Sequence, residues 1–360
     1  MEYFTISLNK SNQIYYSGEK INGTVRLKCF ERLKIKSISV LLKGEANVAW
    51  KIDKLKGKSW IEYVKSKEKY LNKELPILNK RDDSDIYIEP GEHLYQFETS
   101  LPEGMPTSFE HQYGRIRYFI KARLEIPWAF DKETIRTFSV VYPYDLNANS
   151  NLKLALGTSD KKQFCCGPCK SQPIEAKFNI SKGGFVPGEK IICNAFLDNK
   201  SSRQVEQIKI TLYQRMKFSA KDKSKILVRN ISSVSNQSVI GEKKLEKWEN
   251  VALKIPPVCT TTKGTCKIID ISYEVRLSYK VSGVSLPDTD LCIPIIIGTI
   301  PTFSDEILYP SKNYPISFEF SSLNSEPFVD EASERGTNNA EIIENDSINF
   351  RPLYPFYTDN

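Results

Sequence analysis

The chain has 360 residues, of which 40% are hydrophobic and 11% aromatic, and its net charge at neutral pH is +7. This composition is typical of globular domains and excludes a largely disordered protein, and a chain of this length is expected to form more than one domain. It contains no run of about 18 apolar residues, and Met1-Glu2-Tyr3-Phe4-Thr5 lacks the basic start of a signal peptide. We therefore expect a cytoplasmic protein without a membrane span.

The charge is divided unevenly along the chain. Residues 301–360 contain three Lys and Arg but eleven Asp and Glu, a balance of −8, so the first 300 residues carry +15. A basic body suggests acidic partners, such as phosphorylated protein tails or anionic lipid surfaces, but a need for general solubility explains it equally well.

Apolar residues alternate with polar ones from the first residues onward, as in Phe4-Ile6-Leu8 and Ile38-Val40-Leu42. This period of two predicts half-buried strands, and the Gly-containing turns between them predict antiparallel pairing. Parallel units are excluded because no convincing 3.6-residue periodicity separates the strands. The Lys-rich residues 51–75 are expected to form an extended hairpin or a long loop.

The pattern of turns and strands occurs twice along the chain. Residues 16–21, Tyr-Ser-Gly-Glu-Lys-Ile, return 170 positions later as Val-Pro-Gly-Glu-Lys-Ile at 186–191, and Ile38, Val40 and Leu42 return as Ile208, Ile210 and Leu212. Gly18 and Gly188 are expected in tight turns, where Glu19 and Glu189 accept hydrogen bonds from free backbone amides. The repeat predicts an all-β protein of two tandem antiparallel, immunoglobulin-like β-sandwich domains.

Changes in composition place the domain boundaries. We assign residues 1–150 to the first sandwich, 151–173 to an interdomain linker, and 174–301 to the second sandwich. Residues 302–360 lose the alternation and gather Ser, Asn, Glu and Asp, so they are predicted to be a disordered acidic tail.

One strand of the first half carries a basic face. Arg115, Arg117, Lys121 and Arg123 share one parity, while Ile116, Tyr118, Ile120 and Leu124 share the other. The arginines could bind phosphate or acidic cargo through their planar fork, although a solvated strand face gives the same pattern.

Cys165, Cys166 and Cys169 form a cluster in the linker. They could be ordinary reduced thiols, accept an acyl chain beside neighbouring lysines, or serve metal or redox chemistry, for which Cys193 or Cys259 could complete a zinc site. No other feature indicates a cofactor. Neither His93 nor His111 lies near a nucleophile motif, and both are expected to be polar loop residues.

The last residues of the chain are aromatic and contain proline. This peptide comprises Phe350, Arg351, Pro352, Leu353, Tyr354, Pro355, Phe356 and Tyr357. Short apolar peptides in acidic tails are commonly docking motifs, because proline lowers the entropy lost on binding.

Several stretches together resemble the arrestin-domain-containing, or α-arrestin, family over about 300 residues. They are residues 16–23, Leu42-Lys43-Gly44-Glu45-Ala46, Leu101-Pro102, residues 106–110 and 113–118, Pro127-Trp128, residues 161–169 and 184–189, Ile293-Pro294-Ile295 and residues 298–301. The resemblance implies the arrestin fold and a non-enzymatic adaptor that links the cytoplasmic regions of membrane proteins to endocytic sorting or ubiquitination machinery.

The resemblance also implies recruitment to the plasma membrane or endosomes, and peripheral membrane association stays open. Many relatives carry Pro-Pro-x-Tyr in the tail to recruit WW-domain HECT-type ubiquitin ligases, whereas Arg351 stands here in place of the first proline. Two alternatives remain at this stage: a retromer-like sorting scaffold without ligase recruitment, and a thiol-dependent redox or metal protein using the cysteine cluster. Nucleic acid is not expected as a partner, because the basic residues are dispersed and no recognition helix is present.

Overall fold

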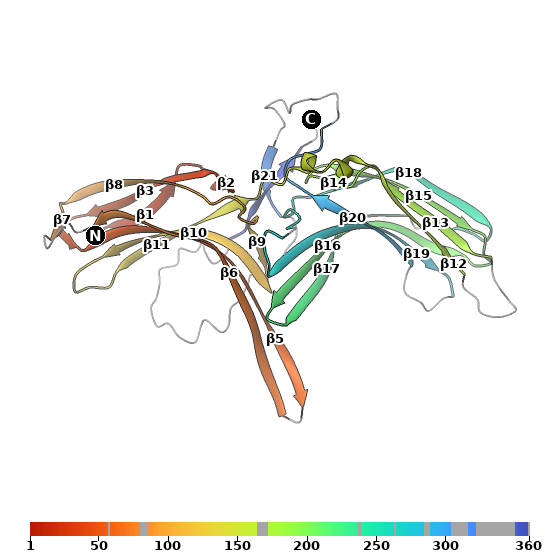
Figure 1. Cartoon of the computed structure of the whole chain (residues 1–360), viewed down its shortest axis with the longest axis horizontal. Helices are drawn as coiled ribbons and strands as arrows, with labels where there is room; N and C mark the ends of the chain where they lie inside the picture. Colours follow the sequence, from red (N-terminus) through yellow and green to blue (C-terminus); the bar gives the residue numbers. More distant parts are fainter. Residues whose placement is uncertain are drawn as a thin grey trace.

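A computed structural model describes residues 1–56, 58–79, 85–163, 172–236, 239–262, 264–283, 289–303, 316–321 and 350–358. These residues form strands almost throughout, with two short 3-10 helices, η1 (Leu146–Ala148) and η2 (Ser150–Lys153). The strands build two sandwiches that lie side by side and meet at a central junction (Figure 1). No helix in the described part of the chain has the length and apolarity needed to cross a bilayer.

The first sandwich packs a three-stranded sheet against a larger one. The small sheet has the order β1 (Tyr3–Leu8), β3 (Lys20–Cys29), β8 (Gly91–Ser100). The large sheet has the order β2 (Ile14–Tyr16), β11 (Lys132–Val141), β10 (Gly114–Glu125), β5 (Ser37–Lys56), β6 (Lys58–Asn79), with β9 (Phe109–His111) paired to β10. Two further short strands, β4 (Leu33–Ile35) and β7 (Ile86–Ile88), pair with each other. Alternate residues of β3 and β10 are buried, as the period of two predicts.

The second sandwich repeats this plan. One sheet has the order β12 (Leu156–Lys162), β13 (Ile174–Ile180), β15 (Lys190–Asn199), β18 (Lys244–Lys254). The other has the order β14 (Gly184–Phe185), β20 (Thr289–Ile297), β19 (Ile269–Val281), β16 (Val205–Ala220), β17 (Lys223–Asn236). Strand β12 lies within the segment 151–173 that the sequence assigns to a linker, so part of that segment belongs to the second sandwich.

The duplicated turn confirms the repeat in atomic detail. Gly18 and Gly188 have φ angles of +87° and +100°, which residues with a Cβ rarely adopt. Glu19 Oε2 accepts a hydrogen bond from the Tyr16 amide at 2.9 Å, and Glu189 Oε2 accepts one from the Val186 amide at the same distance. Both glutamates therefore close their turns as the sequence predicts, and each turn follows the short strand that pairs in parallel with the last strand of its sheet.

The long hairpin formed by β5 and β6 extends away from the body beside the junction (Figure 1). This confirms the hairpin alternative for residues 51–75. The pairing runs from Ser37 with Asn79 to Lys56 with Lys58, with two register shifts on the way. Near the junction the hairpin reaches the second sandwich, where Lys223 Nζ of β17 lies 2.7 Å from Glu62 Oε1 of β6.

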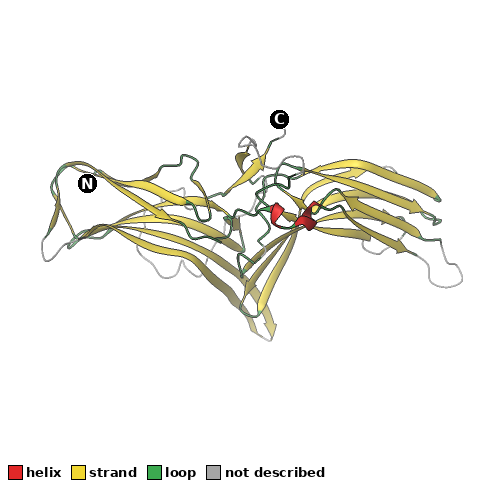
Figure 2. Cartoon of the chain, turned by 45° about the horizontal axis from the view of Figure 1, so that its top comes forward, coloured by secondary structure: helices red, strands yellow, loops and turns green. Residues whose placement is uncertain are grey.

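Two segments of the predicted disordered tail are strands. Strand β21 (Ile316–Phe320) pairs antiparallel with β22 (Leu353–Tyr357), and the pair lies over the junction between the sandwiches (Figures 1 and 2). Side chains of β22 are buried, because Tyr354 joins the hydrophobic core and Phe356 is largely covered. The C-terminal peptide is thus part of the folded body, while most of the acidic tail between these strands lies outside the described residues.

Candidate functional site

The predicted basic face lies on β10, with the expected parity. Ile116, Tyr118, Ile120 and Leu124 are fully buried in the core, whereas the four basic side chains lie on the opposite face of the sheet. The register of β10 between β5 and β11 fixes this parity, since a shift of one residue would turn the arginines into the core. The sequence-based assignment of the two faces therefore agrees with the structure.

Carboxylates from neighbouring segments already engage three of these cations. Arg117 Nε lies 2.7 Å from Glu110 Oε1 of β9, and Lys121 pairs with Glu133 of β11. Arg123 pairs with Asp131 and has Glu125 and Glu133 within 4 Å. A phosphate group on this face would have to compete with these internal partners.

The Arg117–Glu110 pair is the buried member of the set. The two side chains are only 12% and 9% exposed, whereas Arg123 is 47% exposed. Burial raises the pKa of the Glu110 carboxyl, and the nearby Arg117 and Arg115 oppose that shift. Arg117 therefore has a structural partner, and Arg123 is the cation that remains more accessible to a ligand.

The C-terminal peptide crosses from the first sandwich to the second. The Leu353 amide donates to Ser139 Oγ of β11 at 3.3 Å, and the Tyr357 amide donates to the Pro187 carbonyl at 2.9 Å. The Tyr357 hydroxyl donates to the Thr299 carbonyl. The peptide is therefore held at both ends, by one of these hydrogen bonds on the first sandwich and by two on the second.

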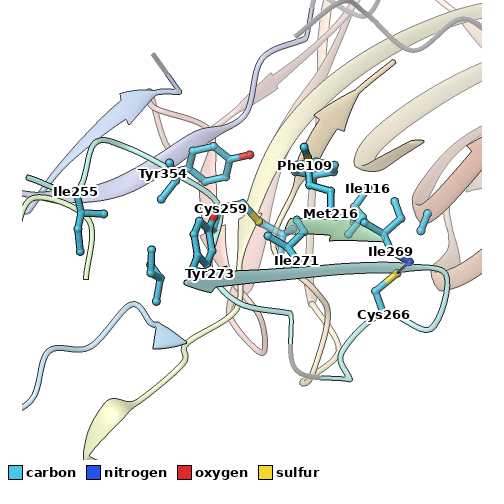
Figure 3. Close-up of a cluster of buried hydrophobic side chains, with 14 of the residues drawn as sticks. Phe109, Ile116, Met216, Ile255, Cys259, Cys266, Ile269, Ile271, Tyr273 and Tyr354 are labelled. Atoms are coloured by element: carbon cyan, nitrogen blue, oxygen red, sulfur yellow. Dashed lines mark hydrogen bonds between the residues drawn. The ribbon is translucent and has the colours of Figure 1, made fainter. Parts of the chain in front are cut away.

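Tyr354 lies between these ends and fills the junction. It is 3% exposed, and burial raises the pKa of its phenol well above the ordinary value. Figure 3 shows it beside Cys259 and Tyr273 of the second sandwich, in a cluster that includes Phe109 and Ile116 of the first. The junction thus accepts an aromatic side chain on an extended strand.

The basic face and the C-terminal peptide, which the sequence treats as separate sites, meet in the structure. The Arg117 guanidinium carbon lies 5.5 Å from the centre of the Phe350 ring. Arg351 donates to the Ser321 carbonyl at 3.1 Å and lies over the Phe320 ring, both at the end of β21. Arg117 therefore links the basic face to the peptide.

The junction itself is aromatic and polar. The His111 and Phe218 rings, from opposite sandwiches, stack with their centres 5.2 Å apart, and Phe218 also approaches Phe109 and Tyr113. Thr107 and Thr260 are hydrogen-bonded across the same boundary at 3.0 Å between their hydroxyl oxygens. These contacts join the two sandwiches through side chains as well as through the connecting chain.

Both histidines correct the expectation of polar loop residues, because both lie on strands. His111 lies on β9 and is buried against Phe218, and its Nδ1 accepts a hydrogen bond from the Tyr113 amide at 3.3 Å. Burial, followed by the charges of Arg229 and Lys225, lowers its pKa to about 4. His93 is half-buried on β8, where its ring contacts the Glu89 carbonyl.

The cysteine cluster at Cys165, Cys166 and Cys169 lies outside the described residues. Cys193 and Cys259, considered from the sequence as further zinc ligands, are buried thiols. Burial raises the pKa of Cys193 to about 12 and also raises that of Cys259, which disfavours the thiolate form that binds metal. No group of three His, Cys, Asp or Glu side chains in the described part of the chain could hold a metal ion.

Comparison with known proteins covers both sandwiches. Residues 4–147 match the family model described as arrestin (or S-antigen), N-terminal domain, and residues 170–302 match the corresponding C-terminal domain model.

Curated relatives extend across most of the chain. Arrestin domain-containing protein 17 of Caenorhabditis elegans is 29% identical over 87% of this chain and 74% of its own length. Arrestin domain-containing protein 4 of Mus musculus is 30% identical over 81% of this chain and 70% of its own length. Thioredoxin-interacting protein of Homo sapiens is 27% identical over 82% of this chain and 74% of its own length.

Proposed function

Because the chain belongs to the arrestin family, we propose that it is an adaptor that links the cytoplasmic parts of membrane proteins to endocytic sorting or ubiquitination machinery. An adaptor of this kind works by holding two partners on one chain, which raises the effective concentration of each near the other. The folded body would take the cargo, and the C-terminal peptide would take the machinery. The general adaptor role follows from the family, and the division of labour is our proposal.

The position of Tyr354 is the observation that supports a partner-binding role for the tail. An aromatic, proline-containing peptide is bound at the junction, yet it is joined to the body through the long acidic segment before residue 350. A partner that reads Pro352-Leu353-Tyr354 needs the tyrosine side chain, which is buried in this arrangement. We therefore propose that capture of the machinery requires the peptide to leave the junction.

For the cargo, we propose an acidic cytoplasmic segment that contacts the first sandwich near Arg123. This side chain is more exposed than those of Arg117 and Lys121 on the same face. Its carboxylate partners Glu125, Asp131 and Glu133 are 36%, 29% and 25% exposed, so an incoming anion can replace one of them at modest cost. Arg117 would instead keep its partner Glu110 because both groups are buried.

The duplicated turn offers a test of the tail with a matched control. In Gly188→Ala the new Cβ would lie 1.9 Å from the Tyr357 carbonyl oxygen, whereas in Gly18→Ala the nearest atom would be Glu103 Cγ at 3.1 Å. Both variants impose a side chain at positive φ, so the backbone strain is common to the two. Only Gly188→Ala is expected to displace the peptide.

The measurement combines amide hydrogen exchange of residues 353–357 with capture of sorting or ligase proteins. Gly188→Ala should accelerate exchange in this peptide and increase capture, while Gly18→Ala should change neither. Faster exchange without increased capture would contradict the proposed role of the peptide. Unchanged exchange in Gly188→Ala would show that docking of the peptide does not depend on the turn at Gly188.

A further inference from the structure

The turn between β10 and β11 exposes two large aromatic side chains. Trp128 is 104% exposed and Phe130 is 88% exposed. This turn lies at the end of the first sandwich that is remote from the junction, on a different part of the molecule from the C-terminal peptide (Figure 1).

The backbone of the turn is unfavourable for a tryptophan. The Ala129 amide donates to the Ile126 carbonyl at 3.5 Å, which places Pro127 and Trp128 at the two central positions. Trp128 has a φ angle of +60°. A turn with proline first and positive φ second ordinarily takes Gly or Asn at that second position, and a bulky residue there is an outlier.

The fold therefore does not explain Trp128. The ring has no place in the core, because it is fully exposed, and its backbone conformation costs stability that glycine would avoid. Large exposed apolar groups on a protein surface mark sites of interaction, and strain retained at such a position strengthens that inference.

Charged side chains surround the turn, and the exposed ones include two lysines. Asp131, Glu133 and Glu125 lie within 4 Å of Arg123, and Glu133 also pairs with Lys121, so these two cations offset most of the charge of the three carboxylates. Lys132 is exposed at the start of β11, and Lys36 is exposed beside the end of β10, where its amide donates to the Glu125 carbonyl at 2.8 Å. Two exposed lysines thus lie near the base of the turn, and together with Arg123 and Lys121 they give four cations against the three carboxylates.

We propose that Pro127–Phe130 is a membrane-interface anchor, in which Trp128 and Phe130 enter the boundary between lipid headgroups and acyl chains. Tryptophan favours this boundary because its large ring is apolar while its N–H remains able to bind polar groups. Lys36 and Lys132 would lie at the level of the lipid phosphates. A projecting tip suits a deformable interface, whereas a protein partner would have to supply a matching hollow.

This inference goes beyond the proposed adaptor function and does not depend on it. It requires a bilayer alone, without cargo or sorting machinery. An anchor at this end would hold the first sandwich against the membrane through two side chains, and such binding is expected to be weak and reversible.

The test measures binding of the full-length chain to vesicles of phosphatidylcholine, and of phosphatidylcholine mixed with phosphatidylserine. Trp128→Gly removes the ring and relieves the backbone, and Leu94→Ala is the control because Leu94 is another exposed apolar residue of the same sandwich, on β8. Trp128→Gly should weaken binding to both vesicles about tenfold. This is the contribution expected if the unaltered chain buries roughly a third of the tryptophan's apolar area in the lipid, a gain that the variant loses. Leu94→Ala should bind like the unaltered chain.

A second readout separates anchoring from a structural role. The thermal midpoint of Trp128→Gly should equal or exceed that of the unaltered chain, because the variant loses no core contact. A lowered midpoint would indicate that the ring supports the fold and would overturn the inference. Equal vesicle binding by Trp128→Gly and the unaltered chain would overturn it as well. Failure of the unaltered chain to bind either vesicle would also overturn the inference. The turn would then be expected to bind a pocket on a partner protein.

Discussion

Replacing Arg117 by alanine tests whether Arg117 stabilises the fold while Arg123, on the same basic face, is available to bind a ligand. Arg117 Nε lies 2.7 Å from Glu110 Oε1, and both side chains are about nine-tenths buried. Removing the arginine leaves a buried carboxylate without its main cation, and breaking such a pair costs about 3 kcal/mol or more. Arg123→Ala is the matched control, since Arg123 is 47% exposed on the same strand and its loss should cost less than about 1 kcal/mol.

The assay is urea unfolding of both variants at neutral pH and at about pH 5. The native pKa of Glu110 already lies above its ordinary value, so the folded state binds this proton more tightly than the unfolded state does. Its stability contribution therefore increases as the pH falls through the native pKa, and loss of Arg117 should raise that pKa further. The loss of unfolding free energy in Arg117→Ala, relative to the unaltered chain, should consequently be smaller at the lower pH.

Two results would refute this reasoning. Equal losses of stability in Arg117→Ala and Arg123→Ala would show that burial does not distinguish the pairs. A loss of stability in Arg117→Ala that is the same at both pH values would show that it does not arise from a buried Glu110 carboxylate without its cation. For the proposed function, Arg123→Ala should weaken cargo capture while leaving the free energy of unfolding nearly unchanged.

Two further predictions concern the junction and the tail. The pKa of His111 is lowered from 6.5 to about 4, so the unfolded chain takes up this proton first, and stability should fall between about pH 6.5 and pH 4 by up to about 3 kcal/mol. His111→Phe keeps a ring beside Phe218 and should lose this part of the pH dependence; parallel unfolding curves for the two proteins at every pH would contradict the assignment. In the isolated peptide 346–360, Arg351→Pro creates Pro-Pro-Leu-Tyr and should strengthen binding to a WW domain. Equal affinities of the two peptides in a titration would contradict it.

The strand pattern and the duplicated turn could be predicted from the sequence because they depend on neighbours along the chain. The alternation on β10 fixes which side chains face the core, and the Gly-Glu pair of each turn closes a local hydrogen bond. Strand β12 gave no such signal. It is the edge strand of its sheet, and although its residues alternate between half-buried and exposed, Leu156 is its only apolar residue.

Contacts between distant segments set the limit of prediction. The burial of His111 depends on Phe218, which lies more than one hundred residues away on the second sandwich. The carboxylates that neutralise the basic face come from β9, β11 and the preceding turn. The sequence of residues 350–357 indicates a docking peptide, but it does not specify whether the peptide docks on another protein or on its own body.

Proximity labelling in living cells, with the full chain and with a chain lacking residues 346–360, tests the adaptor account most directly. The full chain should label both integral membrane proteins and sorting or ubiquitination proteins. The shortened chain should keep the membrane proteins and lose the machinery. Identical sets of labelled proteins for the two chains, or labelling of neither class by the full chain, would contradict the account.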